Sequence, residues 1–130
     1  MRRYLSTQAH RGFTLIELLV VMGIVSLLLT LAVPRYFQSL ETSKEVVLAE
    51  NLHRVRETLD RFYGDHGRYP ESLEELVERR YLRSLPVDPI TESATTWILV
   101  PPGNRGSGNV YDIKSSAEGS TREGKPFREL

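Results

Sequence analysis

Glu17 is the residue whose position most strongly indicates chemistry, because it is a carboxylate inside an apolar segment. The 21 residues from 13 to 33 contain no other charge and no proline, and Gly12 stands directly before them. A carboxylate in the hydrocarbon of a membrane costs about 2.5–3.5 kcal/mol, so it normally has a partner and a role. We therefore expect Glu17 to be a functional residue.

Three acidic residues nearer the C-terminus are candidates for a metal site. Calcium takes about six to eight oxygen ligands, many of them from the backbone, so Asp112, Glu118 and Glu123 are weak calcium candidates. Because the segment has so few carboxylates, we favour solvated loop residues over a metal site. We expect no cofactor.

Residues typical of enzymes do not form a catalytic pattern. His10, His53 and His66 lack metal-ligand spacing, and the sequence has no nucleophile elbow, P-loop or dinucleotide fingerprint. Asp65 and His66 are neighbours in a predicted turn without a nucleophile beside them, and the chain has no cysteine. We therefore predict that the protein is not an enzyme. A membrane-anchored periplasmic enzyme is the alternative from a different class.

Residues 13–33 have the length of a membrane helix. At 1.5 Å per residue they span about 31 Å, which is enough to cross the hydrocarbon core of a bilayer. The leader, 1–12, has three arginines (Arg2, Arg3 and Arg11) and no acid, which favours a cytoplasmic N-terminus and a periplasmic C-terminal domain. The other 14 basic and 17 acidic residues give a net charge of −3, so we expect no nucleic-acid partner.

A second helical segment, 34–63, is predicted to continue from the first. Pro34 lacks a backbone N–H and should kink the helix without ending it. One apolar stripe then recurs at helical spacing: Leu48, Leu52, Val55, Leu59 and Phe62, extended backwards by Tyr36, Leu40 and Val47. Gly64, Gly67 and Pro70 are expected to end the helix.

The remaining residues, 64–130, are predicted to form a small head. Ser72 and Glu75 have the spacing of a capping box, which opens a short helix through about residue 81. The segments 95–100 and 110–114 are predicted to pair as an antiparallel hairpin, and the polar residues after them are left without predicted structure. The fold class is therefore α+β, with one long helix packed on a small antiparallel sheet.

The N-terminal segment 11–19 (RGFTLIELL) resembles the class III signal of type IV pilins and type II secretion pseudopilins. In that family a prepilin peptidase cuts after the glycine, here Gly12, and methylates the new N-terminal phenylalanine, here Phe13. The glutamate at mature position five, here Glu17, helps subunits to assemble into a filament. Pro34 also falls where this family usually has a proline.

The resemblance extends more loosely into the head, where it is to the major, G-type pseudopilins. It rests on the segments 67–70 (GRYP), 72–76 (SLEEL), 85–89 (LPVDP) and 111–115 (YDIKS). In that subfamily a C-terminal loop rich in aspartate and glycine binds calcium. This chain has glutamates but no aspartate after Asp112, which argues against such a site.

The resemblance implies a pilin-like pseudopilin subunit that polymerises into the periplasmic pseudopilus of a type II secretion system and so drives protein export. The implied partners are the prepilin peptidase, copies of itself, other pseudopilins and the inner-membrane assembly platform. The implied location is the inner membrane, crossed once. A minor type IV pilin for surface fibres or DNA uptake is the alternative. A secretory signal, a twin-arginine signal or a plain anchor would not explain Glu17 beside Gly12 and Phe13.

Overall fold

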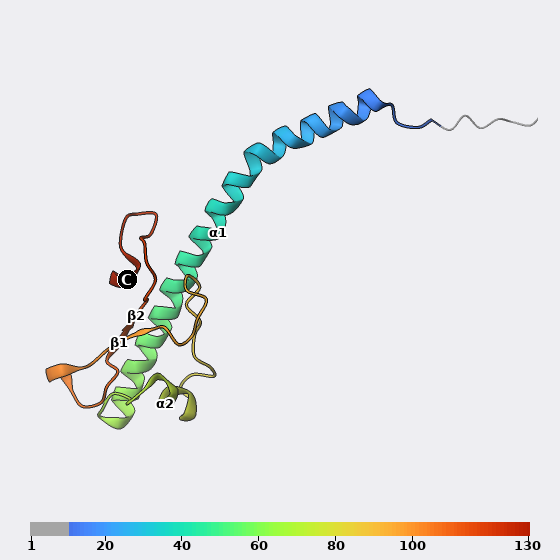
Figure 1. Cartoon of the computed structure of the whole chain (residues 1–130). Helices are drawn as coiled ribbons and strands as arrows, with labels where there is room; N and C mark the ends of the chain where they lie inside the picture. The colour runs from blue at the N-terminus through green and yellow to red at the C-terminus, as the bar shows by residue number, and fades with distance from the viewer. Residues whose placement is uncertain (1–10) are drawn as a thin grey trace, which may run out of the picture. The chain divides into compact units, whose positions relative to one another are not determined.

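The computed structural model describes residues 11–130 (Figure 1). Most of the predicted leader, including Arg2, Arg3 and His10, lies outside the described residues. The chain divides into two compact units, Met1–Gln38 and Ser39–Leu130, and each is described by itself. Helix α1, Leu15–His66, contains residues of both units.

In the first unit, α1 presents an apolar surface that none of the described residues covers. Every large apolar side chain from 13 to 33 is exposed, Phe13 at 88%. Among residues 11–130, α1 is the one helix long and apolar enough to cross a membrane. Pro34 lies inside α1, so the helix continues past it as predicted, and the kink there stays a prediction.

In the second unit, the predicted stripe of α1 forms the centre of the core. Its five residues from Leu48 to Phe62 are 0–1% exposed, which confirms the prediction. The backward extension was wrong, because Leu40 and Val47 are 40% and 47% exposed and Tyr36 in the first unit is exposed as well. At about 100° per residue, Leu40 and Val47 lie about 80–100° around the helix from Leu48, so they do not share its face.

The long helix ends at His66 rather than at residue 63. Gly64 remains helical, whereas Gly67 takes a left-handed conformation with φ of 68° and donates its N–H to the carbonyl of Tyr63 at 2.8 Å. Glycine adopts this conformation without the steric cost that a side chain would add. Gly67 is therefore the residue that turns the chain out of α1.

Helix α2, Leu73–Glu78, begins at the predicted N-cap and ends before residue 81. The hydroxyl of Ser72 accepts the N–H of Glu75 at 3.3 Å. At the other end, Arg80 has φ of 64°, and the N–H groups of Arg80 and Tyr81 donate to the carbonyls of Val77 and Leu76. This is a Schellman motif, which ends the helix. The sequence pattern missed it because an arginine occupies the position that glycine usually takes.

Strands β1, Ile98–Val100, and β2, Asp112–Lys114, form the predicted antiparallel hairpin (Figure 1). Leu99 pairs with Ile113, and the connection contains the short 3-10 helix η1, Gly103–Arg105. Both strands are shorter than the predicted segments 95–100 and 110–114. The two central positions differ sharply, since Ile113 is fully buried and Leu99 is 44% exposed.

Contacts with other segments explain why the strands are short. Trp97 lies before β1 and is buried, with its indole N–H donating to the carbonyl of Pro86 at 2.9 Å. The N–H of Val110 donates to the carbonyl of Pro70 and not to β1. Gly108 makes this approach possible, because a Cβ there would lie 2.1 Å from the carbonyl oxygen of Tyr69. Residues 107–110 therefore pair with 69–70.

The C-terminal segment 115–130, for which no structure was predicted, is part of the folded unit. It ends in the 3-10 helix η2, Phe127–Glu129, and Ser120 forms an isolated bridge with Pro126. Its buried residues complete a core made of Leu48, Leu52, Val55, Leu59, Phe62, Leu73, Leu76, Trp97, Val110, Ile113, Ala117 and Phe127. The second unit is thus an α+β fold, in which α1 packs on a small antiparallel sheet.

Candidate functional site

The start of α1 is organised around Thr14 and Glu17. Glu17 lies in the first turn, and its N–H donates to the hydroxyl of Thr14 at 3.1 Å. The N–H of Leu18 donates to the carbonyl of Thr14, also at 3.1 Å. The Thr14 hydroxyl therefore satisfies one of the free donors at this helix end, and its carbonyl accepts the first regular hydrogen bond of the helix. Our sequence analysis missed Thr14, although the spacing T-x-x-E before an apolar run is a known start signal.

Gly12 and Phe13, the predicted processing residues, precede the helix. Both are exposed, and a side chain at Gly12 would meet no atom within 4 Å. The bond between them is therefore accessible. Because α1 begins only at Leu15, no helical turn holds the nitrogen of Phe13 above the side chain of Glu17. The structure thus places three of the predicted residues within one short exposed segment.

The carboxylate of Glu17 is the unusual polar group of this segment. The hydroxyls of Ser26 and Thr30 donate to carbonyls one turn earlier, each at 2.8 Å, so their hydrogen-bond donors are satisfied within the helix. Between residues 11 and 130, no cationic side chain pairs with Glu17. A carboxylate in an apolar surrounding normally has a charge partner, and residues 11–130 do not supply one.

The three calcium candidates do not come together. Asp112 accepts the Nε–H of Arg56 at 2.8 Å, while Glu118 and Glu123 are exposed. Among the described residues, no group of three or more acidic or histidine side chains could hold a metal ion. The expectation that the protein needs no calcium stays a prediction.

Arg56 is the partner of Asp112 in an ion pair at 2.8 Å. Besides Asp112, its guanidinium donates to the carbonyls of Ile113, at 3.2 Å, and Leu130, at 2.7 Å. One arginine thus joins α1, β2 and the C-terminus through charge-assisted hydrogen bonds. Our sequence analysis missed it, because no local pattern relates residues 56, 112 and 130.

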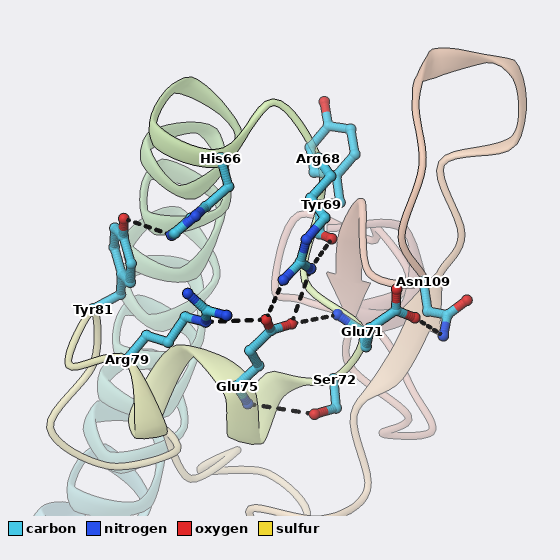
Figure 2. Close-up of polar contacts among 9 residues, drawn as sticks. All are labelled: His66, Arg68, Tyr69, Glu71, Ser72, Glu75, Arg79, Tyr81 and Asn109. Carbon is cyan, nitrogen blue, oxygen red and sulfur yellow. Dashed lines mark hydrogen bonds and ion pairs between the residues drawn. The ribbon is translucent and has the colours of Figure 1, made fainter.

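Figure 2 shows a second polar network, centred on the carboxylate of Glu75. It accepts hydrogen bonds from Arg68 at 2.6 Å and from the N–H of Glu71 at 2.8 Å, and it pairs with Arg79 at 3.2 Å. The Arg68 guanidinium, with the Glu71 N–H, lowers the pKa of Glu75 to about 2, and Glu75 in turn raises the pKa of Arg68. The network holds the turn after α1 against α2.

Asp65 and His66, which are neighbours in the sequence, both contact the hydroxyl of Tyr81, and Figure 2 shows the contact with His66. The Tyr81 hydroxyl donates to Asp65 and lies 3.3 Å from Nε2 of His66. The hydrogen bond to Asp65 raises the pKa of Tyr81, which makes it a poorer source of phenolate. The rings of His66 and Tyr81 both pack on Phe62. These contacts therefore hold Tyr81 against the last turn of α1, and they do not activate a nucleophile.

Comparison with known proteins gives matches over both units. Residues 7–33 match the family described as the prokaryotic N-terminal methylation motif. The type II secretion system core protein G of Escherichia coli strain K12 is 30% identical over 127 residues, which cover 85% of this chain and 83% of that protein. The protein of the same name from Klebsiella pneumoniae is 30% identical over 122 residues, covering 82% and 85%.

A type IV major pilin of Neisseria gonorrhoeae matches over a shorter stretch. It is 35% identical over 66 residues, which cover 48% of this chain and 38% of the pilin. No solved structure matches the chain significantly. The likeness to the core proteins G extends over most of both chains, whereas the likeness to the pilin does not.

Proposed function

The chain belongs to the family of type II secretion system core proteins G, and we propose that this pseudopilin is cut after Gly12, methylated at Phe13 and polymerised into a periplasmic pseudopilus that drives protein export. The observation that carries the proposal is Glu17, a carboxylate in the first turn of an apolar helix that pairs with no cationic side chain between residues 11 and 130. The exposed bond between Gly12 and Phe13 lies where a peptidase would have to reach it.

The proposed location is the inner membrane, with residues 13–33 crossing it once. The apolar side chains of this stretch are exposed along the helix, and lipid would remove them from water. The arginines of the leader favour a cytoplasmic N-terminus, so the second unit lies in the periplasm. The proposed partners are the prepilin peptidase, other pseudopilins and the inner-membrane assembly platform.

Cleavage gives Glu17 a possible partner, because it creates an amine at Phe13 that is protonated at neutral pH. Within one subunit, Phe13 precedes the N-cap Thr14, so the helix does not fix its amine against Glu17. We propose that the amine of an incoming subunit pairs with Glu17 of its neighbour. The free-energy cost of each charge in lipid is then removed only when subunits assemble. Charge neutralisation is thereby coupled to polymerisation.

An export role is better supported than a role in surface fibres. The core proteins G of Escherichia coli and Klebsiella pneumoniae are matched over 83% and 85% of their own length, whereas the gonococcal pilin is matched over 38% of its length. No observation on the second unit favours a pilus over a secretion system. We therefore retain export as the proposed function.

The processing step is tested by the intact mass of the membrane-extracted protein, expressed with and without a prepilin peptidase. With the peptidase we expect a chain that begins at Phe13 and carries one added methyl group. A Gly12→Leu variant is the matched control and should remain uncut, because the peptidase would have to accommodate a larger side chain beside the bond that it cuts. A mature chain that begins near Val33, or an uncut wild-type chain, would contradict the proposal.

A further inference from the structure

A groove of about 700 Å³ lies in the second unit between α1 and the segment 81–89. Buried Val55 and Thr58 form part of its floor. Val47 and Val87 line it as well, and they are 47% and 51% exposed. The groove therefore offers apolar surface that the chain itself leaves uncovered.

The charged residues that line this groove are mainly basic: Arg54, Arg61 and Arg83, against one acid, Glu57. Arg54 and Arg61 pair with glutamates on α1 only at 3.8 and 4.0 Å, and the four side chains are each more than 60% exposed. Such pairs contribute little, so these arginines remain available to a partner. Within residues 11–130, exposed Arg83 has no ion pair.

A surface of opposite charge lies on the outer side of α2. Leu73 and Leu76 turn one face of this helix into the core. Glu74 and Glu78, one helical turn apart, are exposed, and neither forms an ion pair with any residue that the structure describes. The second unit thus carries a basic groove and a separate acidic helix face.

We propose that the basic groove of one copy binds the acidic face of α2 of the next copy. The two surfaces differ, so the contact is heterologous, and repeated heterologous contacts build a helical filament rather than a closed dimer. Opposite charges would set the register, while Val47 and Val87 would supply apolar contact. This inference rests on the proposed function, because it names the contact between the globular heads of neighbouring subunits in the pseudopilus.

Disulfide crosslinking tests the contact in the full-length protein, because the chain has no cysteine of its own. We would introduce Ser84→Cys in the groove and Glu74→Cys on α2, then oxidise intact cells that assemble filaments. The double variant should give a ladder of crosslinked multimers. The two single variants expressed together should give dimers only. As a matched control, Asn104→Cys, in the exposed η1 connection, replaces Ser84→Cys and should give no ladder.

Charge reversal then tests whether the arginine and the glutamate meet. In the double-cysteine chain, Arg83→Glu or Glu78→Arg alone should reduce the ladder at least about tenfold, because like charges then face each other. The two reversals together should restore it, and Arg83→Lys should leave it unchanged. A ladder that survives both single reversals, or one that the combined reversal does not restore, overturns the contact.

The same cells separate this contact from the proposed function. Filaments that form without any ladder would overturn the contact between groove and α2 and leave the pseudopilin function intact. A wild-type chain that is never cut and never enters filaments would overturn the proposed function, and the contact with it. Urea unfolding of each purified variant checks that the head remains folded.

Discussion

The two units differ in what surrounds their apolar side chains, although α1 supplies residues to both. In residues 13–33 every large apolar side chain is exposed, whereas from 48 to 62 the apolar stripe is almost fully buried. A helix that is apolar all round requires an apolar surrounding, and a helix with one apolar stripe requires only one covering layer. The described residues therefore leave the apolar side chains of the first unit uncovered, whereas the second unit buries its own stripe.

The units differ in the same way in their charges. In the second unit, partly buried Arg56 and Glu75 have several partners each, and buried Asp88 accepts the hydroxyl proton of Ser115 and two backbone N–H groups. Among the described residues, no buried side-chain nitrogen or oxygen lacks a partner. The carboxylate of Glu17 in the first unit has no charge partner among residues 11–130. A satisfied charge is typical of a structural role, whereas an unsatisfied one in an apolar helix is typical of a functional site.

Glu17→Leu should produce the largest effect, which is loss of assembly. The variant should still insert and be cut, because removing the carboxylate makes insertion easier by about 2.5–3.5 kcal/mol. Secretion should be lost and the protein absent from sheared filaments. Glu17→Gln, which keeps the size but not the charge, should be intermediate or inactive. Wild-type assembly of Glu17→Leu would show that the charge is incidental.

Truncation of an apolar residue separates the two units by stability. Leu52→Ala, in the buried stripe, should destabilise the head by about 3 kcal/mol, because it leaves a cavity in a packed core. Leu27→Ala, the matched change in the exposed segment, should leave unfolding of the head unaltered. Urea unfolding of the full chain in detergent, followed by Trp97 fluorescence, measures both. Equal destabilisation would mean that the units do not behave as separate bodies.

Arg56→Gln should destabilise the head by about 2 kcal/mol, because Asp112 and the carbonyl of Leu130 lose a charged donor. Arg56→Lys should recover only part of the loss, since an ammonium cannot reproduce the planar arrangement of donors in the guanidinium. Urea unfolding of the purified variants measures both.

We also expect the wild-type head to have the same melting temperature in calcium and in chelator. If the head had a calcium site, calcium at 100 times the dissociation constant would raise the free energy of unfolding by about 2.7 kcal/mol and the melting temperature visibly.

Glu75→Gln should produce the smallest effect, about 1 kcal/mol, because Arg68 and Arg79 remain partly exposed to solvent. The pKa of Glu75 is about 2 in the folded chain and 4.5 in the unfolded one. Its stabilisation is therefore complete above about pH 4.5 and is lost as the pH falls towards 2. The difference between wild type and variant in urea unfolding should shrink over this range. A difference independent of pH would contradict the ion pair.

The features that the sequence determined by itself depend on residues close together in the chain. Gly12, Phe13 and Glu17 stand in register with the apolar run, and the spacing from Leu48 to Phe62 indicated the buried stripe. The N-cap at Ser72 and the antiparallel hairpin were also predicted correctly. Helix periodicity, capping and strand alternation are local properties, so a single sequence reveals them.

Other features were decided only when distant segments met. The approach of 107–110 to 69–70 shortened the strands, and the polar C-terminal segment placed Phe127 in the core. Arg56 pairs with Asp112, which is 56 residues away in the sequence and was one of the calcium candidates. The free energy of such contacts depends on which groups become neighbours and lose water together. No local pattern encodes that, so the tertiary structure alone decided it.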